Sequence, residues 1–353
     1  MIRSILIVPD SLKGSCSAQQ AANAIAEGLW QASHELILKK MPLADGGEGT
    51  MEAIRSICGG EYKTTAVCDP LRRKHTARYL QLPDKKTAVI EVAETCGLTL
   101  LSQEERDPMR ATTSGLGEQL SAAYRDGNRH FIVGLGGSAT CDAGAGMIEA
   151  IGGNGFGELL NCTYTILCDV NNPLYGKDGA ACVFAPQKGA NTEEVKLLDD
   201  YLRTFARLHG EKHAFTPGAG AAGGLGYAFL TFFHAHLYSG IDYLLHLSDF
   251  DRRAKEADLI VTAEGRSDKQ TLSGKVPFGV LQHAKQYSVP VVVMAGEVRD
   301  KEDLSAAGFA DVLCINTSDT DKRLIMQETY AYKQLKNCAR GLSVEKYITR
   351  KGT

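Results

Sequence analysis

The stretch "SILIVPDSLKGS", residues 4–15, joins a short apolar run to a turn that carries chemically active side chains. The apolar run is typical of a buried strand, and a helix is predicted directly after the turn. Ser17 is a suitable N-cap for that helix, and Gln20 stands where a capping box needs it. A tight connection needs only Gly, Pro, Asn or Asp. This one contains a carboxylate, two hydroxyls and an ammonium group, which together suit a phosphate. These residues are Asp10, Ser11, Ser15 and Lys13.

Strand and helix patterns alternate at both ends of the chain. "LILKKMPLA" reads as a second strand before the helix opened by "GGEGT", and "DLIVTA", "PVVVMAG" and "DVLCIN" continue the alternation in the last third. Such alternation predicts a parallel sheet with helices packed on it. Residues 62–94 instead read as three successive strands, which parallel units do not produce. We therefore predict an α/β protein with two domains: 1–65 plus 255–353, and an inserted mixed α/β domain over 66–254, with the active site in the cleft between them.

Composition narrows the class of protein. The 353 residues are 44% hydrophobic and 23% charged, with a net charge of −3, and no basic stretch predicts a nucleic-acid partner. No apolar run is long enough to span a bilayer, and the first residues lack a signal-peptide pattern, so we expect no membrane partner. Ten scattered cysteines without a CxxC pair indicate reduced thiols and a cytoplasmic protein. The oligomeric state stays open, with a homodimer as one alternative.

Five segments combine glycine with polar side chains, and four of them follow strand-like runs. In open α/β sheets, ligands bind outside the carboxyl ends of the strands, where backbone N–H groups and helix N-termini attract anions. The five segments together therefore predict a phosphorylated ligand. They are "PDSLKGS" (9–15), "ADGGEGT" (44–50), "GLGGSAT" (134–140), "GAGAAGGLG" (218–226) and "AEGRSDKQTLSGK" (263–275).

Two nucleotide signatures fit this sequence poorly. "LSGKVP" lacks the residues of a P-loop, whereas "GAGAAG" (218–223) matches the GxGxxG pattern of dinucleotide sites. The residues before it, with Pro217 at the point of entry, make a poor strand, so a Gly-rich turn that opens a helix over 222–236 is the favoured interpretation. An NAD-binding oxidoreductase and a non-catalytic binder of a small carboxylate are the alternatives to a kinase.

A kinase needs carboxylates for Mg²⁺, cations for the phosphoryl group and a residue that positions the attacking hydroxyl. The polar segments supply both kinds of charge. A structural alternative applies to some of them: Asp45 and Asp142 as helix caps, Lys188 and Lys275 as solvated side chains. The set "EGRSD" favours function, because burying it for any other reason is costly. The candidate carboxylates are Asp45, Glu48, Asp169, Glu264 and Asp268, and the candidate cations are Lys13, Lys188, Arg266 and Lys275.

Long motifs resemble the bacterial class I glycerate kinases, in the order of that family and over most of the chain. They include "PLADGGEGT", "GLGGSATCDAGAGM", "CDVNNPLYGKDGAACVFAPQKGA" and "EGRSDKQTLSGKVPFGV". The resemblance implies phosphorylation of D-glycerate by ATP with Mg²⁺, most often at the 2-hydroxyl to give 2-phosphoglycerate. It also implies a flavodoxin-like parallel-sheet domain that is split by the inserted domain. Transfer to the 3-hydroxyl, or to a related small hydroxy acid, is the alternative.

The resemblance also implies site residues, position by position. We assign the catalytic roles as follows: Asp268 or Asp169 orients or deprotonates the hydroxyl, while Lys13 and Arg266 counter phosphoryl and carboxylate charge. Asp45 and Asp169 are the candidate Mg²⁺ ligands. The expected substrate- and phosphate-binding residues are Asp10, Ser11, Asp45, Gly46, Gly47, Glu48, Thr50, Gly137, Ser138, Thr140, Asn172, Glu264 and Lys275.

Several positions depart from the family pattern. Its members usually carry Asn where this chain has Cys141, Asp where it has Asn171, and Gly where it has Ala143 and Ala263. The segment around 150–165 is also short. We expect these changes to affect substrate preference and efficiency more than the class of reaction.

Overall fold

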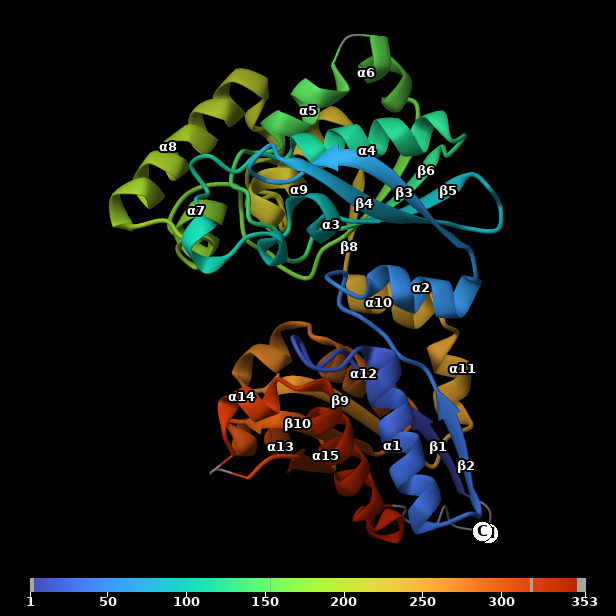
Figure 1. The fold of residues 1–353 in the computed structure, drawn as a ribbon. Coiled ribbons are helices and arrows are strands. Elements are labelled where there is room, and N and C mark those ends of the chain that lie inside the picture. Colours follow the sequence, from blue (N-terminus) through green and yellow to red (C-terminus); the bar gives the residue numbers. More distant parts are fainter. Residues whose placement is uncertain (1–2, 153, 318–319, 348–353) are drawn as a thin grey trace. The chain divides into compact units, whose positions relative to one another are not determined.

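The computed structural model describes residues 3–152, 154–317 and 320–347 (Figure 1). It divides into two compact units: Met1–Asp45 with Ile241–Thr353, and Gly46–Gly240. Helix α2 (Thr50–Cys58) and strand β3 (Glu61–Cys68), which we expected in the first domain, belong to the second unit. Strand β3 belongs to the second unit because it pairs antiparallel with the whole of β4 (Lys74–Gln81).

The first unit is formed by both ends of the chain. Its strands are β1 (Arg3–Ile7), β2 (Leu36–Lys40), β9 (Leu259–Ser267), β10 (Val291–Val298) and β11 (Asp311–Cys314). Its helices are α1 (Ala18–Ala32), α10 (Gly240–Leu247, whose first residue lies in the second unit), α11 (Phe250–Lys255), α12 (Val276–Lys285), α13 (Lys301–Ala307), α14 (Lys322–Ile325) and α15 (Glu328–Arg340), with 3₁₀ turns η5 (Lys269–Ser273) and η6 (Val344–Lys346).

The sheet of the first unit is entirely parallel, in the order β11-β10-β9-β1-β2. Numbered within the unit, this is the 2-1-3-4-5 order of flavodoxin-like folds. The order reverses between β1 and β9, so the turns that follow these two strands lie side by side at the carboxyl edge. In such sheets this switch point is where ligands bind.

Local sequence explains why α1 follows β1 so closely. Ser17 caps the helix through the capping box with Gln20 that the sequence predicts. The apolar positions Ala21, Ile25 and Leu29 are fully buried. They pack in one core cluster with alternate residues of β1, β9 and β10 and with α15. Gly28 allows the close crossing of the two helices, because a Cβ there would clash with the carbonyl oxygen of Lys336.

The second unit contains the remaining elements. Its strands are β3 and β4, already given, then β5 (Thr87–Glu91), β6 (His130–Gly134), β7 (Thr163–Leu167) and β8 (His236–Tyr238). Its helices are α2, α3 (Ala93–Cys96), α4 (Ser114–Arg125), α5 (Ala145–Ile151), α6 (Asn154–Leu159), α7 (Ala180–Phe184), α8 (Thr192–His209) and α9 (Ala221–Phe232), with 3₁₀ turns η1 (Leu98–Leu100), η2 (Gln103–Glu105), η3 (Pro186–Lys188) and η4 (Glu211–His213).

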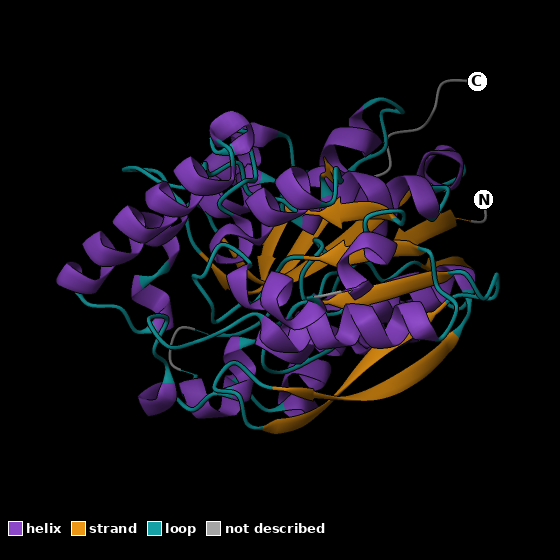
Figure 2. Ribbon diagram, turned by 90° about the horizontal axis from the view of Figure 1, so that it is seen from above, coloured by secondary structure: helices purple, strands orange, loops and turns teal. Residues whose placement is uncertain are grey.

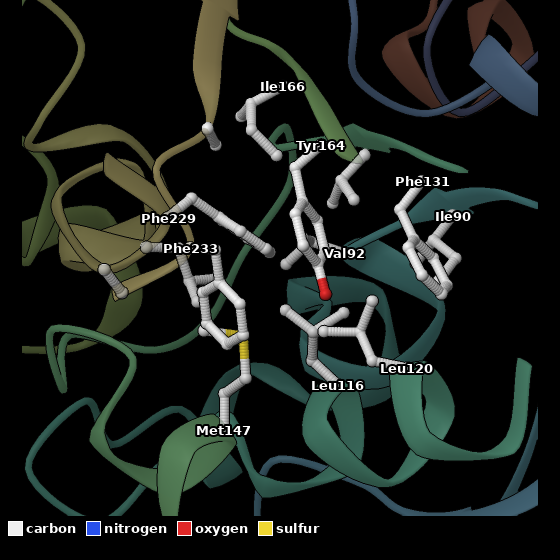
Figure 3. Close-up of a cluster of buried hydrophobic side chains, with 14 of the residues drawn as sticks. Ile90, Val92, Leu116, Leu120, Phe131, Met147, Tyr164, Ile166, Phe229 and Phe233 are labelled. Carbon is white, nitrogen blue, oxygen red and sulfur yellow. The ribbon is translucent and has the colours of Figure 1, made fainter. Parts of the chain in front are cut away.

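The sheet of the second unit is mixed, in the order β3-β4-β5-β6-β7-β8. The first three strands are antiparallel neighbours and the last four are parallel, which confirms the three successive strands expected over 62–94. Figure 3 shows the apolar cluster of this unit. Tyr164 lies at its middle, with its ring stacked on Phe131 at 5.3 Å and its hydroxyl donating to the Leu159 carbonyl at 2.9 Å.

Helices pack over the strands, as an α/β architecture requires (Figure 2). Within the residues described, none of the helices has both the length and the apolar character that a membrane crossing demands.

Candidate active site

The turn after β1 places a buried carboxylate at the edge of the first sheet. The Asp10 N–H donates to the Ala263 carbonyl on β9 at 2.8 Å, which extends the sheet pairing into the turn. The Asp10 side chain is buried and accepts the Ser11 N–H at 2.6 Å. Lys13 lies further along the same turn, with its Nζ 3.8 Å from the Asp45 Oδ2. The sequence-predicted residues of this turn therefore gather at the switch point.

The end of β9 supplies a second buried carboxylate. One oxygen of Glu264 accepts hydrogen bonds from the Ser267 and Thr271 hydroxyls, both at 2.7 Å. The other lies 3.4 Å from the Lys275 Nζ. Lys275 precedes α12 and is also 4.0 Å from the Asp268 carboxylate. The cation therefore lies between the two acidic groups of "EGRSD" and is only partly exposed, so it is not a solvated side chain.

Asp268 and Arg266 are held in different ways. Asp268 is the N-cap of η5 and accepts the Gln270 N–H at 2.9 Å, which fixes its carboxylate. Arg266 is half-exposed, and its Nε donates to Glu297 on β10 at 2.7 Å. Because β9 and β10 pair in register at these positions, the ion pair follows directly from the sheet.

Burial and like charge perturb the acidic groups. Burial raises the pKa of Asp10 well above its usual value, and the neighbouring Asp45 and Glu264 raise it further, against the lowering effect of Lys13. Burial also raises the pKa of Glu264, opposed chiefly by Lys275. Buried carboxylates that crowd together in this way are typical of sites that receive a cation or move a proton.

These side chains border a pocket of about 1020 Å³ within the first unit. Its walls come from the turns after β1, β9, β10 and β11 and from the chain around Met326. Among the residues described, no three or more His, Cys, Asp or Glu side chains form a metal-binding group. Mg²⁺ needs no such cage, since one or two carboxylates and the phosphates of a substrate suffice.

The second unit brings "ADGGEGT" and "GLGGSAT" together at the carboxyl end of its own sheet. Gly134 and Gly136 allow the contact, because a Cβ on either would clash with the backbone of Gly46 or Gly47. Thr50 opens α2, and its hydroxyl donates to the Gly47 carbonyl at 2.7 Å. The Gly49 N-cap has no side-chain cap bond, so Asp45 does not cap this helix. The Glu48 side chain is exposed.

Sequence reasoning missed Glu91, the last residue of β5. It is buried, and its carboxylate accepts the Met51 N–H in the first turn of α2 at 2.7 Å. Burial raises the pKa of Glu91 to about 7, against the lowering effect of the backbone donors. A carboxylate that ends a buried strand was the available signal, but the apolar run "TAVIEVA" concealed it.

Lys188, one of the candidate cations, is buried. The structural alternative of a solvated side chain is therefore wrong, because Lys188 is only 3% exposed. Its Nζ donates to the Ser138 hydroxyl at 2.9 Å and to the Thr140 carbonyl at 2.7 Å. Gly137 precedes them with a φ of 77°, in the left-handed region that favours glycine. Lys188 therefore anchors the "GLGGSAT" turn.

The other carboxylates of this unit have structural partners. Asp142 accepts the N–H groups of Gly144 and Gly146 at the start of α5, which confirms its role as a cap. Asp169 accepts the Ser239 hydroxyl at 3.0 Å and the Gly240 N–H at 2.9 Å. The Asn172 side-chain amide donates to the Asp178 carbonyl at 2.7 Å.

The segment "GAGAAGGLG" opens α9, as expected, but regular helix begins only after residues 222–224, which have positive φ. The helix also ends at Phe232, short of the predicted end at 236, where β8 begins. No strand leads into it within the described chain, since 211–213 form the turn η4. Its glycines serve close packing: a Cβ on Gly220 would clash with the Pro173 carbonyl, and one on Gly223 with the Thr140 carbonyl. The context of a dinucleotide site is therefore missing.

The structure thus sorts the predicted site residues into two groups. The first unit gathers Asp10, Ser11, Lys13, Asp45, Glu264, Arg266, Asp268 and Lys275. The second unit contains Gly46, Gly47, Glu48, Thr50, Gly137, Ser138, Thr140, Asp169 and Asn172.

A doubly wound sheet with acidic and basic side chains at its carboxyl edge is the kind of site that phosphotransferases use. The sequence profile of the Glycerate kinase family matches residues 5–158 and 154–343. The chain belongs to the glycerate kinase family, and it is a kinase.

Individual relatives agree with this assignment. The chain is 40% identical over 327 residues to the glycerate kinase of Halalkalibacterium halodurans, covering 84% of this chain and 86% of the relative. It is 39% identical over 327 residues to the glycerate 2-kinase of Escherichia coli, with the same coverage. A crystal structure from Salmonella typhimurium, of a protein assigned as glycerate kinase 2, superimposes with a TM-score of 0.79 at 36% identity and covers 96% of this chain and 97% of the other.

Proposed function

We propose that this enzyme transfers a phosphoryl group from ATP to D-glycerate, at the 2-hydroxyl, to give 2-phosphoglycerate. One observation carries the proposal: in a chain of this family, the buried Asp10 carboxylate lies close enough to Glu264 to be perturbed by it, and Glu264 pairs with the Lys275 ammonium at 3.4 Å, at the switch point of a parallel sheet. Phosphoryl transfer depends mainly on positioning and on charge, and both are present in this group.

Asp268 is our proposed base, or positioning group, for the attacking hydroxyl. Its carboxylate is held by the Gln270 N–H and lies on the pocket wall. Lys13 and Arg266 lie on the same wall and counter the charge of the phosphoryl group and of the substrate carboxylate. The ion pair with Glu297 holds the Arg266 guanidinium in place for this role.

The carboxylates of Asp10 and Asp45 are suitable ligands for Mg²⁺. Asp45 lies close enough to Asp10 to raise the pKa of Asp10, and such a like-charge pair gains from a divalent cation. We propose that Asp45 and Asp10 hold the ion, with Asp169 as the alternative ligand. When bound, Mg²⁺ neutralises charge on the phosphate oxygens.

We propose that the turns of the second unit bind the substrate or phosphate through Gly46, Gly47, Glu48 and Thr50, and through Gly137, Ser138, Thr140 and Asn172. The contact of "ADGGEGT" with "GLGGSAT" supports this assignment, because it joins two of the glycine-rich turns into one surface. Backbone N–H groups in such turns suit phosphate oxygens.

A product assay tests the function. Purified protein, ATP, Mg²⁺ and D-glycerate are coupled to enolase and pyruvate kinase, without phosphoglycerate mutase. We expect a signal, because enolase accepts 2-phosphoglycerate directly; reactions that lack D-glycerate are the control. A signal only after mutase is added means that the 3-hydroxyl is phosphorylated. No product under either condition contradicts the proposed substrate.

We also propose a cytoplasmic location. All ten cysteines are free thiols, which supports a reducing compartment. The homodimer remains a prediction, and sedimentation equilibrium of the purified chain tests it.

A further inference from the structure

We propose that the apolar end of the pocket in the first unit binds the adenine base of the nucleotide, with the Asn316 Oδ1 accepting a hydrogen bond from the exocyclic amino group. The identity of the nucleotide rests on the proposed function. The site itself rests on the chemistry of the pocket walls.

The pocket has two chemically different ends. The turns after β1 and β9 contribute the charged side chains described above. The other walls come from the ends of β10 and β11 and from the chain around α14 and α15, and they carry a group of apolar side chains beside polar ones. These apolar residues are Val298, Cys314, Ile315, Ile325, Met326 and Ala331.

Met326 presents an apolar side chain to the pocket. It is 53% exposed and lines the pocket, so it is available to a ligand. Methionine is soft and flexible, and it packs well against flat aromatic rings. Gly14, in the turn after β1, leaves room for the Met326 methyl group, since a Cβ there would clash with it. The apolar end therefore adjoins the turn that we assign to phosphate or substrate.

Asn316 is one of the polar residues beside these apolar side chains, together with Thr317 and Thr320. Its Nδ2 donates to the Gly296 carbonyl at 2.8 Å, which sets the orientation of the amide. Its Oδ1 is buried and has no hydrogen-bond partner in the described part of the chain. An unpaired buried acceptor is costly, so each one calls for an explanation. Asn316 lines the pocket, so the amino group of a base that reaches this oxygen would satisfy it.

The size of the pocket supports a ligand larger than glycerate. Its volume of about 1020 Å³ is at the top of the range of roughly 300–1,000 Å³ typical of sites for drug-sized ligands. Glycerate is a small acid with no apolar face, so it has no use for walls of Ile, Val and Met. A nucleotide has both parts: phosphates for the charged end and a flat base for the apolar end.

Equilibrium binding tests this proposal without turnover. Isothermal titration with Mg²⁺ present compares ATP with ITP, whose base has a carbonyl in place of the amino group. We expect Asn316→Ala to weaken ATP binding about tenfold, the effect of about 1.4 kcal/mol, and to leave ITP binding unchanged. We expect Met326→Gln, a neutral change at an exposed position, to weaken both nucleotides and to leave tripolyphosphate binding unchanged. Met109→Gln, at an exposed methionine of the second unit, is the matched control.

The outcomes separate the two proposals. If wild-type protein binds no ATP, the proposed function and the base subsite both fail. If ATP binds and both the Asn316 and Met326 variants bind it as the wild type does, only the base subsite is overturned. Equal weakening of ATP and ITP by Asn316→Ala overturns the hydrogen bond to the amino group.

Discussion

Replacing Lys188 by methionine should change how the stability of the protein depends on pH. Lys188 is buried, and burial lowers its pKa to about 8 from 10.5, against the raising effect of Cys141, Asp142 and Cys96. The folded protein therefore releases this proton at a lower pH than the unfolded chain does. Between these two pKa values the unfolded state binds more protons, so stability rises with pH.

The size of this effect on the unfolding free energy follows from the lowered pKa of Lys188. Lowering the pKa from 10.5 to about 8 corresponds to a cost of about 3 kcal/mol for keeping the ammonium buried and charged. This cost is present below pH 8 and disappears as the pH rises toward 10.5. We expect most of it, roughly 2 to 3 kcal/mol, to be recovered between pH 7 and pH 10. The lost hydrogen bonds to Ser138 and Thr140 change the absolute stability of the variant but not this slope.

Urea denaturation of both proteins, followed by circular dichroism from about pH 7 to pH 10, measures the effect. Most cysteine and tyrosine titrations are common to both, so the difference in unfolding free energy reports on Lys188 and on its coupling to Cys141. Lys177→Met is the matched control, since that side chain is 93% exposed in the same unit, and its difference from wild type should stay constant. A Lys188→Met difference that is also independent of pH would refute the argument that burial depresses this group.

Three further outcomes are expected. Asp268→Asn keeps the cap on the Gln270 N–H and should retain the fold, yet lower kcat by about 10²-fold or more; turnover near that of the wild type removes Asp268 from the mechanism. Lys13→Ala should raise KM for ATP or for D-glycerate, and steady-state kinetics with both KM values unchanged would contradict a charge-countering role. Ser288→Gly should raise the unfolding free energy by about 0.5–1 kcal/mol, because Ser288 is exposed and has a φ of 55°, a left-handed conformation that costs a non-glycine residue more than glycine loses in the unfolded chain; a lower denaturation midpoint would show that no strain is stored there.

The sequence by itself determined the local features of this protein. The 3.6-residue spacing of Ala21, Ile25 and Leu29 and the capping pair Ser17 and Gln20 act within one or two turns of chain, and the helix is where they predict it. The three consecutive strands of the second unit were equally readable, because turn residues separate their apolar runs. Glycine-rich turns at strand ends indicated where the polar groups of the site would lie.

Only the tertiary structure decided which of these groups meet and which are buried. Asp10 and Glu264 are 254 positions apart in the chain, and they become neighbours because β1 pairs with β9. Lys188 and Glu91 look like ordinary polar residues until the turns that cover them are in place. Burial and charge coupling depend on what surrounds a side chain in space, and residues distant in sequence supply those surroundings. A local pattern therefore predicts a helix or a turn, whereas the environment that perturbs a carboxylate or a lysine is a property of the whole fold.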